Sequence, residues 1–228
     1  MISIAIDGPA GAGKTTIAKR VAKKLNLVYV DTGAFYRTVA VAIQRNGWKL
    51  DNISEELLQT IKLDVQLMDG VQRMLLNRED VTDLLRTPEI SKLASDSSAL
   101  PVVRIFLLKT QQDLAQRTSV IMEGRDIGTV VLPDATLKVF MTADLDVRAE
   151  RRMKELNDSR YTFEDVRSAM VARDQNDSTR KIAPLQQADD AYYLNTSKMS
   201  LEEVEERILE FLDCQLETTR LCKGVLCK

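Results

Sequence analysis

The stretch Gly8-Pro9-Ala10-Gly11-Ala12-Gly13-Lys14-Thr15, followed by Thr16, fits the pattern G-x-x-x-x-G-K-[ST]. An apolar run, Ile2–Asp7, precedes it, and apolar residues recur at helical spacing from Ile17 to Leu25 after it. Strand, glycine-rich turn and helix N-terminus together bind phosphate, because the glycines let backbone N–H groups turn inward and the helix dipole adds positive charge. We therefore predict a nucleotide-binding loop, with Lys14 on the β- and γ-phosphates and the Thr15 hydroxyl on Mg²⁺.

Length and composition limit the function classes. The 228 residues suit one large α/β domain, or a core with an inserted lobe, and 44% hydrophobic with 29% charged residues is typical of a soluble globular protein. A net charge of -2 gives no sign of wholesale nucleic-acid or membrane binding, so an anion site must be a local cluster of cations. The chain has no histidine, which excludes histidine triads, histidine-ligated metals and a histidine general base.

The cysteines and the N-terminus bear on the compartment. Cys214, Cys222 and Cys227 are odd in number and lack metal-ligand spacing, which argues against a disulfide framework or a zinc site. The N-terminus has no basic segment before its apolar run, and that run is cut by Asp7. No stretch is long enough to span a bilayer. We expect a cytoplasmic protein with reduced thiols.

The order of apolar segments predicts a parallel sheet with crossover helices. Val28–Asp31 is a second strand, and a helical face follows it up to the Asn46-Gly47 stop. The pattern changes from Ser54 to about Leu100. There, Lys62–Met68 and Gln72–Leu76 alternate around Asp69-Gly70 as in a hairpin, and the amphipathic pieces between Val81 and Ala99 break at Pro88. This region is predicted to be a lobe inserted in the parallel core.

The core pattern resumes with a long helix over 101–116 and continues to the end of the chain. Strands are predicted at 119–123, 137–141 and 192–194, and helices at 145–156, from Thr162 to about Asn176, and from Ser200 onward. Asn157–Arg160 is predicted to be a loop, and the tail after Leu216 a solvated end.

Acids end three predicted strands, and arginines gather around them. Asp7, Asp31 and Glu123 are expected at the carboxyl edge of the sheet, where α/β proteins bind ligands and where carboxylates can hold Mg²⁺ directly or through water. Arg37 and Arg125 directly follow two of these strands, and guanidinium groups suit phosphate because they bind it in bidentate fashion. Further arginines follow at positions 148, 151, 152, 160, 173 and 180. Phosphoryl transfer to an acceptor that is already an anion needs positioning and cations rather than a strong base.

Four segments resemble the motifs of bacterial cytidylate kinases, in that family's order. They are the phosphate loop, Asp31–Arg37, Glu123–Val131 and Arg173–Arg180, and Val81–Pro88 is similar to the family's insert. The likeness extends to about Leu212. The Gly124–Thr129 segment is far more specific than the phosphate loop, which many families share.

The resemblance implies an α/β fold with a parallel-sheet P-loop NTPase core, helices on both faces, an inserted nucleoside-monophosphate-binding lobe and a short lid. The implied single kinase domain, 1–228, has its core at about 1–53, 101–156 and 177–213, the acceptor lobe at about 54–100, the lid at about 157–176 and a tail at 214–228. The implied reaction is ATP with CMP or dCMP, giving ADP with CDP or dCDP, with Mg²⁺. The implied partners are nucleotides only, and we expect a monomer.

The resemblance also implies roles at matching positions. The implied ATP residues are Gly8, Pro9, Ala10, Gly11, Ala12, Gly13, Lys14, Thr15 and Thr16. The implied CMP residues are Thr32, Tyr36, Arg37, Ser95, Arg104, Arg125, Asp126, Asp177 and Arg180, of which Ser95, Arg104 and Asp126 would bind the cytosine base. The implied catalytic residues are Lys14, Arg125, Arg151, Arg152 and Arg173, and the implied metal residue is Thr15, with Asp31 or Glu123 through water.

Two departures and two alternatives stay open. Phe35 stands where many relatives have Met, and Glu123 where many have Asp, which lengthens the arm toward Mg²⁺. A switch-type NTPase would share the phosphate loop, but neither an Asn/Thr-Lys-x-Asp base-binding motif nor a switch Asp-x-x-Gly after a strand is found. Within the kinases, UMP, AMP or a small alcohol such as shikimate is the alternative acceptor.

Overall fold

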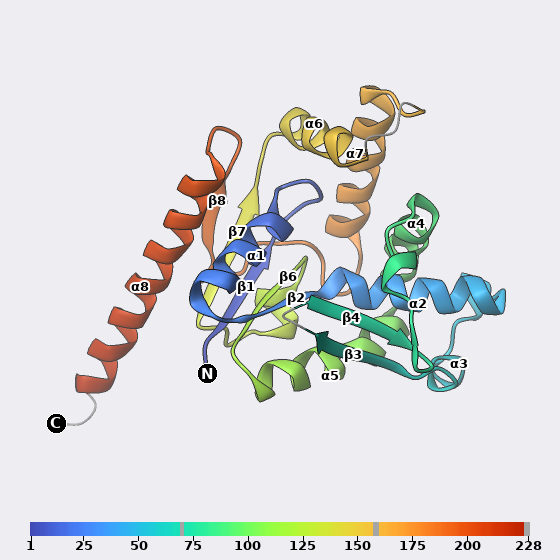
Figure 1. Cartoon of the computed structure of the whole chain (residues 1–228), viewed down its shortest axis with the longest axis horizontal. Coiled ribbons are helices and arrows are strands. Elements are labelled where there is room, and N and C mark those ends of the chain that lie inside the picture. The colour runs from blue at the N-terminus through green and yellow to red at the C-terminus, as the bar shows by residue number, and fades with distance from the viewer. Residues whose placement is uncertain (69–70, 157–159, 226–228) are drawn as a thin grey trace.

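A five-stranded parallel sheet in the order β2-β6-β1-β7-β8 forms the centre of the computed structural model (Figure 1). The structure describes residues 1–68, 71–156 and 160–225. The strands are β1 (Ser3–Asp7), β2 (Val28–Asp31), β6 (Val120–Gly124), β7 (Leu137–Thr142) and β8 (Tyr192–Asn195). β1 pairs in parallel with both β6 and β7, so the strand that precedes the glycine-rich loop is central and is buried on both faces.

Helices cover both faces of this sheet, as expected. α1 (Lys14–Leu25) and α8 (Leu201–Val225) pack on one face, where Ile17 and Val21 share a core with Ile208. α2 (Thr32–Asn46) and α5 (Pro101–Arg117) pack on the other, where Val39 and Leu107 are fully buried. The predicted α/β fold with helices on both faces is confirmed.

The inserted lobe holds a second, three-stranded sheet. β3 (Leu63–Met68) and β4 (Val71–Leu76) form the predicted hairpin, although its Asp69-Gly70 turn lies outside the described residues. A short strand, β5 (Glu79–Asp80), adds to β4 and was not predicted. The lobe is completed by η1 (Leu50–Asn52), α3 (Glu55–Gln59), η2 (Thr82–Leu84) and α4 (Pro88–Ser97).

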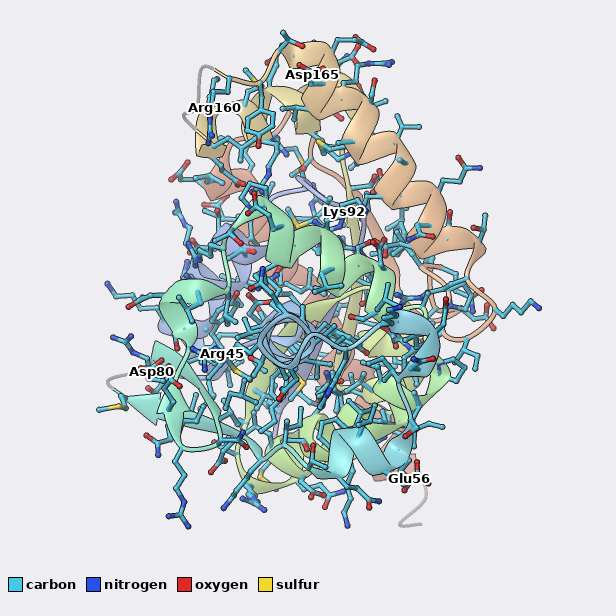
Figure 2. The ribbon with its side chains drawn as sticks, turned by 90° about the vertical axis from the view of Figure 1, so that its right-hand side faces the viewer. Arg45, Glu56, Asp80, Lys92, Arg160 and Asp165 are labelled. Carbon is cyan, nitrogen blue, oxygen red and sulfur yellow. The ribbon has the colours of Figure 1, made fainter. Side chains whose placement is uncertain are left out.

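The lobe shares its apolar core with the main sheet. Leu58, Met74 and Ile90 from the lobe lie in one buried cluster with Val30 and Phe35 from the β2–α2 unit. Figure 2, which faces the lobe, shows Arg45 and Asp80 over the small sheet, with Arg160 and Asp165 together at the far end of the molecule. The lobe is therefore packed directly against the core rather than connected to it only by linkers.

Two predictions about the second half of the chain need correction. α7 (Phe163–Thr179) starts with a capping box at Thr162, as predicted, but continues past Asn176 to Thr179. The chain after Leu216 is not irregular as far as Val225, because α8 continues to that residue, and Cys214 is an exposed free thiol on this helix. α6 (Leu145–Leu156) ends as predicted, and Asn157–Ser159 of the predicted loop lie outside the described residues. Within the described ranges, no helix combines the length and apolarity needed to cross a membrane.

Candidate active site

The glycine-rich loop lies between β1 and α1 in a conformation that side chains would prevent. Gly8, Gly11 and Gly13 have φ values of 148°, 70° and 91°, in the region that glycine occupies most easily. A Cβ on Gly8 would lie 1.9 Å from the Met141 carbonyl oxygen, so β7 packs directly against the start of the loop. Two independent constraints, dihedral angle and packing, therefore require glycine at position 8.

Lys14 folds back over this loop. Its ammonium group donates to the carbonyl oxygens of Gly8 at 2.8 Å and Pro9 at 2.7 Å, and its side chain is buried. Burial lowers the pKa of Lys14 to about 7, and the neighbouring charge of Arg125 acts in the same direction. The side chain is held at the mouth of the loop in a site that favours its charged form only once an anion enters.

Side chains from other elements hold the outside of the loop. Ala10 N–H donates to Asp174 Oδ1 at 3.3 Å, so this amide points away from the phosphate position assigned to the loop. On the other side, Arg151 donates to Ala12 O at 3.3 Å and to Thr196 O at 2.9 Å. The structure thus places Arg151 against the loop and the end of β8, apart from the cations described below.

Three strand-end acids occupy different environments. Asp7 accepts from the backbone N–H groups of Ile127 at 2.8 Å and Gly128 at 2.7 Å, and burial raises its pKa to about 6. Both carboxylate oxygens are used to hold the turn η3 (Ile127–Val131). Asp31 caps α2 through Ala34 N–H and pairs with Arg37 at 2.5 Å. The carboxylates of Asp7 and Asp31 are therefore both engaged in contacts that stabilise the fold.

Glu123 is the acid beside the metal position predicted from the sequence. Its carboxylate is buried, accepts from Tyr29 Oη at 2.5 Å and lies in hydrogen-bonding reach of the Thr15 hydroxyl. Burial, and then the charge of Asp31, raise the pKa of Glu123. A threonine hydroxyl beside a carboxylate is an oxygen donor set that fits Mg²⁺, which keeps several waters and phosphate oxygens as its other ligands. Among the described residues, no cluster of three or more metal-binding side chains was found.

Cations from four elements converge near Lys14. Arg125 follows β6 and pairs with Asp177 at 2.7 Å, whereas Arg173 projects from α7. Burial, and then the charge of Arg125, lower the pKa of Arg173 to about 10, and the charge of Arg37 acts in the same direction. In the described part of the chain, the buried Nε atoms of Arg37 and Arg173 have no hydrogen-bond partner. Mutually repelling guanidinium groups with buried, unpaired N–H donors are typical of an anion site.

A second cluster lies next to these cations. Asp126 is buried, with Arg104 against one carboxylate oxygen and Arg180 at 3.3 Å from the other. The Arg104 guanidinium carbon stands 5.3 Å from the centre of the Tyr36 ring. Burial raises the pKa of Tyr36 to about 12, so its hydroxyl stays protonated at neutral pH. Asp177 joins the two clusters, since it pairs with Arg125 and lies 3.8 Å from Arg180.

The other predicted site residues lie outside the two charged clusters or have their polar groups already engaged in other contacts. Thr32 is buried and donates to Glu123 O at 2.7 Å, so its hydroxyl proton is already used. Ser95 is half-buried on α4, and the hydrogen bond found at this residue is to its carbonyl, from Ser98 Oγ. Arg152 pairs with Glu155 at 3.1 Å and still contributes to the field at Arg173. Thr15 and Thr16 are exposed at the start of α1.

Several residues that the sequence analysis did not single out support the site. Gln72 from the lobe accepts from Asp31 N–H at 2.7 Å and donates to Asp31 O at 3.2 Å, tying β4 to the end of β2. Ser98 O accepts from Arg104 at 3.2 Å. Asp174 and Arg148, to which the sequence pattern assigns no role, both contact the loop. A polar residue on an alternating strand or a helix gives no sequence signal of a partner 40 or more residues away.

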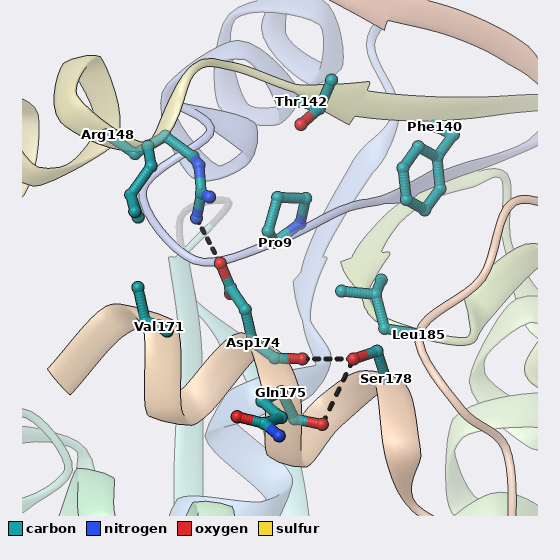
Figure 3. Close-up of a pocket in the computed structure, with 10 residues that line it drawn as sticks. Pro9, Phe140, Thr142, Arg148, Val171, Asp174, Gln175, Ser178 and Leu185 are labelled. Atoms are coloured by element: carbon teal, nitrogen blue, oxygen red, sulfur yellow. Dashed lines mark hydrogen bonds and ion pairs between the residues drawn. The ribbon is translucent and has the colours of Figure 1, made fainter. Parts of the chain in front are cut away.

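A pocket of about 470 Å³ lies beside the loop (Figure 3). Pro9, Leu145, Arg148, Val171 and Asp174 are among its lining residues, and its wall carries the Arg148–Asp174 contact. Lys14, Arg125, Arg173 and Asp126 do not line it. The cation cluster around Lys14 and this pocket therefore lie at different places around the same loop.

Solved structures show that the fold is shared with phosphotransferases. The chain matches an uncharacterised protein from Eubacterium ventriosum with a TM-score of 0.54 at 15% identity, covering 93% of this chain and 99% of that one. It matches a gluconokinase from Sinorhizobium meliloti with a TM-score of 0.50 at 14% identity, covering 96% of each chain. At these identities the likeness concerns the fold alone.

Sequence relatives are much closer. The chain is 45% identical over 213 residues to a cytidylate kinase of Caldicellulosiruptor saccharolyticus, covering 92% of this chain and 94% of that protein. It is 45% identical over 215 residues to one of Carboxydothermus hydrogenoformans, and 43% identical over 215 residues to one of Bacillus cereus, in both cases covering 92% of this chain and 96% of the relative. The family model described as cytidylate kinase matches residues 4–213. With a phosphate loop, a converging set of cations and this similarity over nearly its whole length, the chain belongs to the cytidylate kinase family.

Proposed function

We propose that this enzyme transfers the γ-phosphoryl group of ATP to CMP or dCMP, with Mg²⁺, and releases ADP with CDP or dCDP. The observation that carries the proposal is the convergence of Lys14, Arg37, Arg125 and Arg173 beside the buried Asp126–Arg104–Arg180 cluster. The four cations can neutralise a phosphoryl group that passes between two anions. The Asp126 cluster can hydrogen-bond to a base that has an amine and a carbonyl on one edge.

The cation set supports phosphoryl transfer without a general base. The acceptor oxygen belongs to a phosphate and is already negative, so catalysis needs alignment and neutralisation of charge on the transferred group. Lys14 is positioned on the donor side, where it exchanges the Gly8 and Pro9 carbonyls for phosphate oxygens. Arg37, Arg125 and Arg173 supply the acceptor side, and the Nε–H groups of Arg37 and Arg173, which have no hydrogen-bond partner among the described residues, gain partners when the anions bind.

Thr15 and Glu123 would hold Mg²⁺ through their oxygens and through water. When bound, the ion neutralises charge on the β- and γ-phosphates. Tyr29 keeps the Glu123 carboxylate turned toward Thr15 in its absence, because its hydroxyl donates to that carboxylate.

The Asp126 cluster supports a cytosine acceptor. A carboxylate accepts from the exocyclic amine of cytosine, and the neighbouring guanidinium groups of Arg104 and Arg180 can donate to the ring nitrogen and carbonyl. Uracil presents a carbonyl where cytosine has its amine, and two acceptors would then face each other without a proton. Arg104 and Tyr36 stack, so the guanidinium is held in one plane.

The experiment is a coupled assay of ADP release with ATP, Mg²⁺ and a panel of CMP, dCMP, UMP, AMP, GMP and shikimate. We expect strong turnover with CMP and dCMP and weak turnover with the others. Turnover spread evenly over the nucleoside monophosphates would support the proposed kinase activity but refute selection of cytosine. Slow release that ignores every acceptor would refute the kinase and identify a switch-type NTPase.

A further inference from the structure

Two side chains, Asp174 and Arg148, hold residue 10 of the phosphate loop from outside. Asp174 Oδ1 accepts from Ala10 N–H at 3.3 Å, while Arg148 Nη1 donates to Ala10 O at 3.0 Å. The two side chains also pair with each other, Arg148 Nη1 to Asp174 Oδ2 at 2.5 Å. Both backbone polar groups of Ala10 are therefore satisfied by one ion pair, which leaves the loop little freedom to rotate this peptide.

The contacts of Arg148 and Asp174 with Ala10 are rigid and largely screened from water. Arg148 also donates through Nε to Ala143 O at 2.8 Å, so its guanidinium is fixed at both edges. The two side chains are 10% and 20% exposed, a range in which charge-assisted hydrogen bonds keep much of their strength. The next loop residue is packed as tightly, because a Cβ on Gly11 would lie 2.9 Å from Arg148 O and 2.8 Å from the Met170 methyl group.

The helix that supplies Asp174 also supplies the acceptor site. Arg173 and Asp177 lie on α7, one turn apart, and Arg180 caps the helix. Asp177 pairs with Arg125, and Arg180 lies against Asp126. One face of α7 thus holds the donor loop while an adjacent face holds the acceptor residues.

We propose that Asp174, held by Arg148, is a positioning residue that ties the phosphate loop to α7, so that donor and acceptor nucleotides bind with positive cooperativity through this helix. The inference rests on the proposed function. An acceptor that draws Arg173, Asp177 and Arg180 together fixes α7, and α7 in turn fixes Ala10 in the arrangement that the donor phosphates need. The linkage is reciprocal, so each nucleotide tightens the other by the same factor.

The test measures CMP affinity by calorimetry, with and without a non-hydrolysable ATP analogue and Mg²⁺, and steady-state kinetics alongside. Asp174→Asn keeps a carbonyl oxygen for Ala10 N–H but loses the charge that holds Arg148. We expect the wild type to bind CMP about tenfold tighter when the analogue is present, within the usual range of coupling between sites. In Asp174→Asn we expect this factor to fall to about one, with a raised KM for ATP and an unchanged affinity for CMP alone.

The chain offers a matched control. Arg167 and Asp146 form an ion pair at 2.7 Å between the same two helices, α7 and α6, but in an exposed position away from the loop. Asp146→Asn should retain the full coupling factor and the KM for ATP. If Asp146→Asn loses coupling as Asp174→Asn does, or if Asp174→Asn retains it, the proposal is wrong, because general packing of the two helices would then account for the result.

A second variant covers the case in which Asp174→Asn does not fold. Arg148→Lys keeps a positive charge beside Asp174 but cannot reach Ala143 O and Ala10 O at once. We expect reduced coupling at an unchanged unfolding midpoint, and full coupling would overturn the proposal. Failure of the proposed function itself would be distinct, since the wild type would then show no turnover with CMP.

Discussion

The Lys14 ammonium group donates to the Gly8 carbonyl at 2.8 Å, across the loop that both residues belong to. Without a ligand, the Lys14 amino group thus lies against backbone oxygens of the phosphate loop itself. The contact closes the loop without a ligand, and an incoming phosphate replaces it with a stronger, charged acceptor.

Lys14→Ala removes the donor-side cation. We expect kcat to fall by about 10²–10³-fold, because the side chain neutralises charge that develops on the transferred group. The control is Lys19→Ala, since Lys19 lies exposed on the same helix with its ammonium 5.4 Å from the Tyr29 ring centre, and it should retain kcat within about twofold. Steady-state kinetics with saturating CMP checks both, and an active Lys14→Ala would remove Lys14 from the mechanism.

Donor binding should take up a proton above neutral pH. Burial lowers the pKa of Lys14 to about 7, so at pH 8 the side chain is mostly neutral in the empty protein. The negative charge of ATP raises that pKa again, and the lysine then binds a proton from solution. Calorimetry of ATP binding at pH 8, in two buffers of different ionisation enthalpy, should give an uptake approaching one proton. Equal uptake in Lys14→Met would assign the proton to another group.

Asp126→Asn should relax selection of the base. The amide can donate where the carboxylate could only accept, so uracil gains a partner that it lacks in the wild type. We expect the ratio of kcat/KM for CMP over UMP to fall by about tenfold or more, the usual effect of one base-edge contact. Asp190→Asn is the control, since the Asp190 carboxylate is exposed and pairs with Lys138 rather than with the Asp126 cluster, and this variant should leave the ratio unchanged. An unaltered ratio in Asp126→Asn would rule out contact between this carboxylate and the base.

Substitutions at two glycines of positive φ can distinguish the cost of a packing clash from the cost of backbone strain. Gly8→Ala would place a Cβ 1.9 Å from Met141 O, whereas Gly47, with φ 63°, has nothing within 4 Å of a Cβ. We expect Gly47→Ala to cost about 1 kcal/mol from strain alone, and Gly8→Ala about 3 kcal/mol or more because β7 must also move. Urea unfolding of the two variants checks the difference, and equal losses would show that Met141 gives way freely.

The parts of the fold that were predicted correctly depend on local pattern. The strand before Gly8, the helix after Lys14 and the hairpin either side of residues 69 and 70 each have a clear period and a clear break. The end of α8 was predicted wrongly because the apolar spacing weakens after Leu216, although the helix continues.

The parts of the site that escaped prediction depend on distant contacts. Gln72 looked like an outward polar residue of an alternating strand, and only the folded chain shows it bound to Asp31. The structure holds Arg151 against Ala12 and Thr196, contacts that its place on an arginine-rich helix does not indicate. Family resemblance alone groups Asp126 and Arg104 with Ser95, and it does not bring Arg180, which lies 3.3 Å from Asp126, into that set.

The central position of β1 has a consequence for how the protein is made. Ser3 pairs with Val120 and Ile4 with Leu137, so β1 leaves the ribosome more than 100 residues ahead of the two strands that flank it. At a translation rate of ~5–20 residues per second, this apolar segment waits on the order of ten seconds without a partner. During that interval Ile4 and Ile6, fully buried in the finished enzyme, are open to chaperones and to other nascent chains, and their burial is complete only once α8, which shares their core, has also been made.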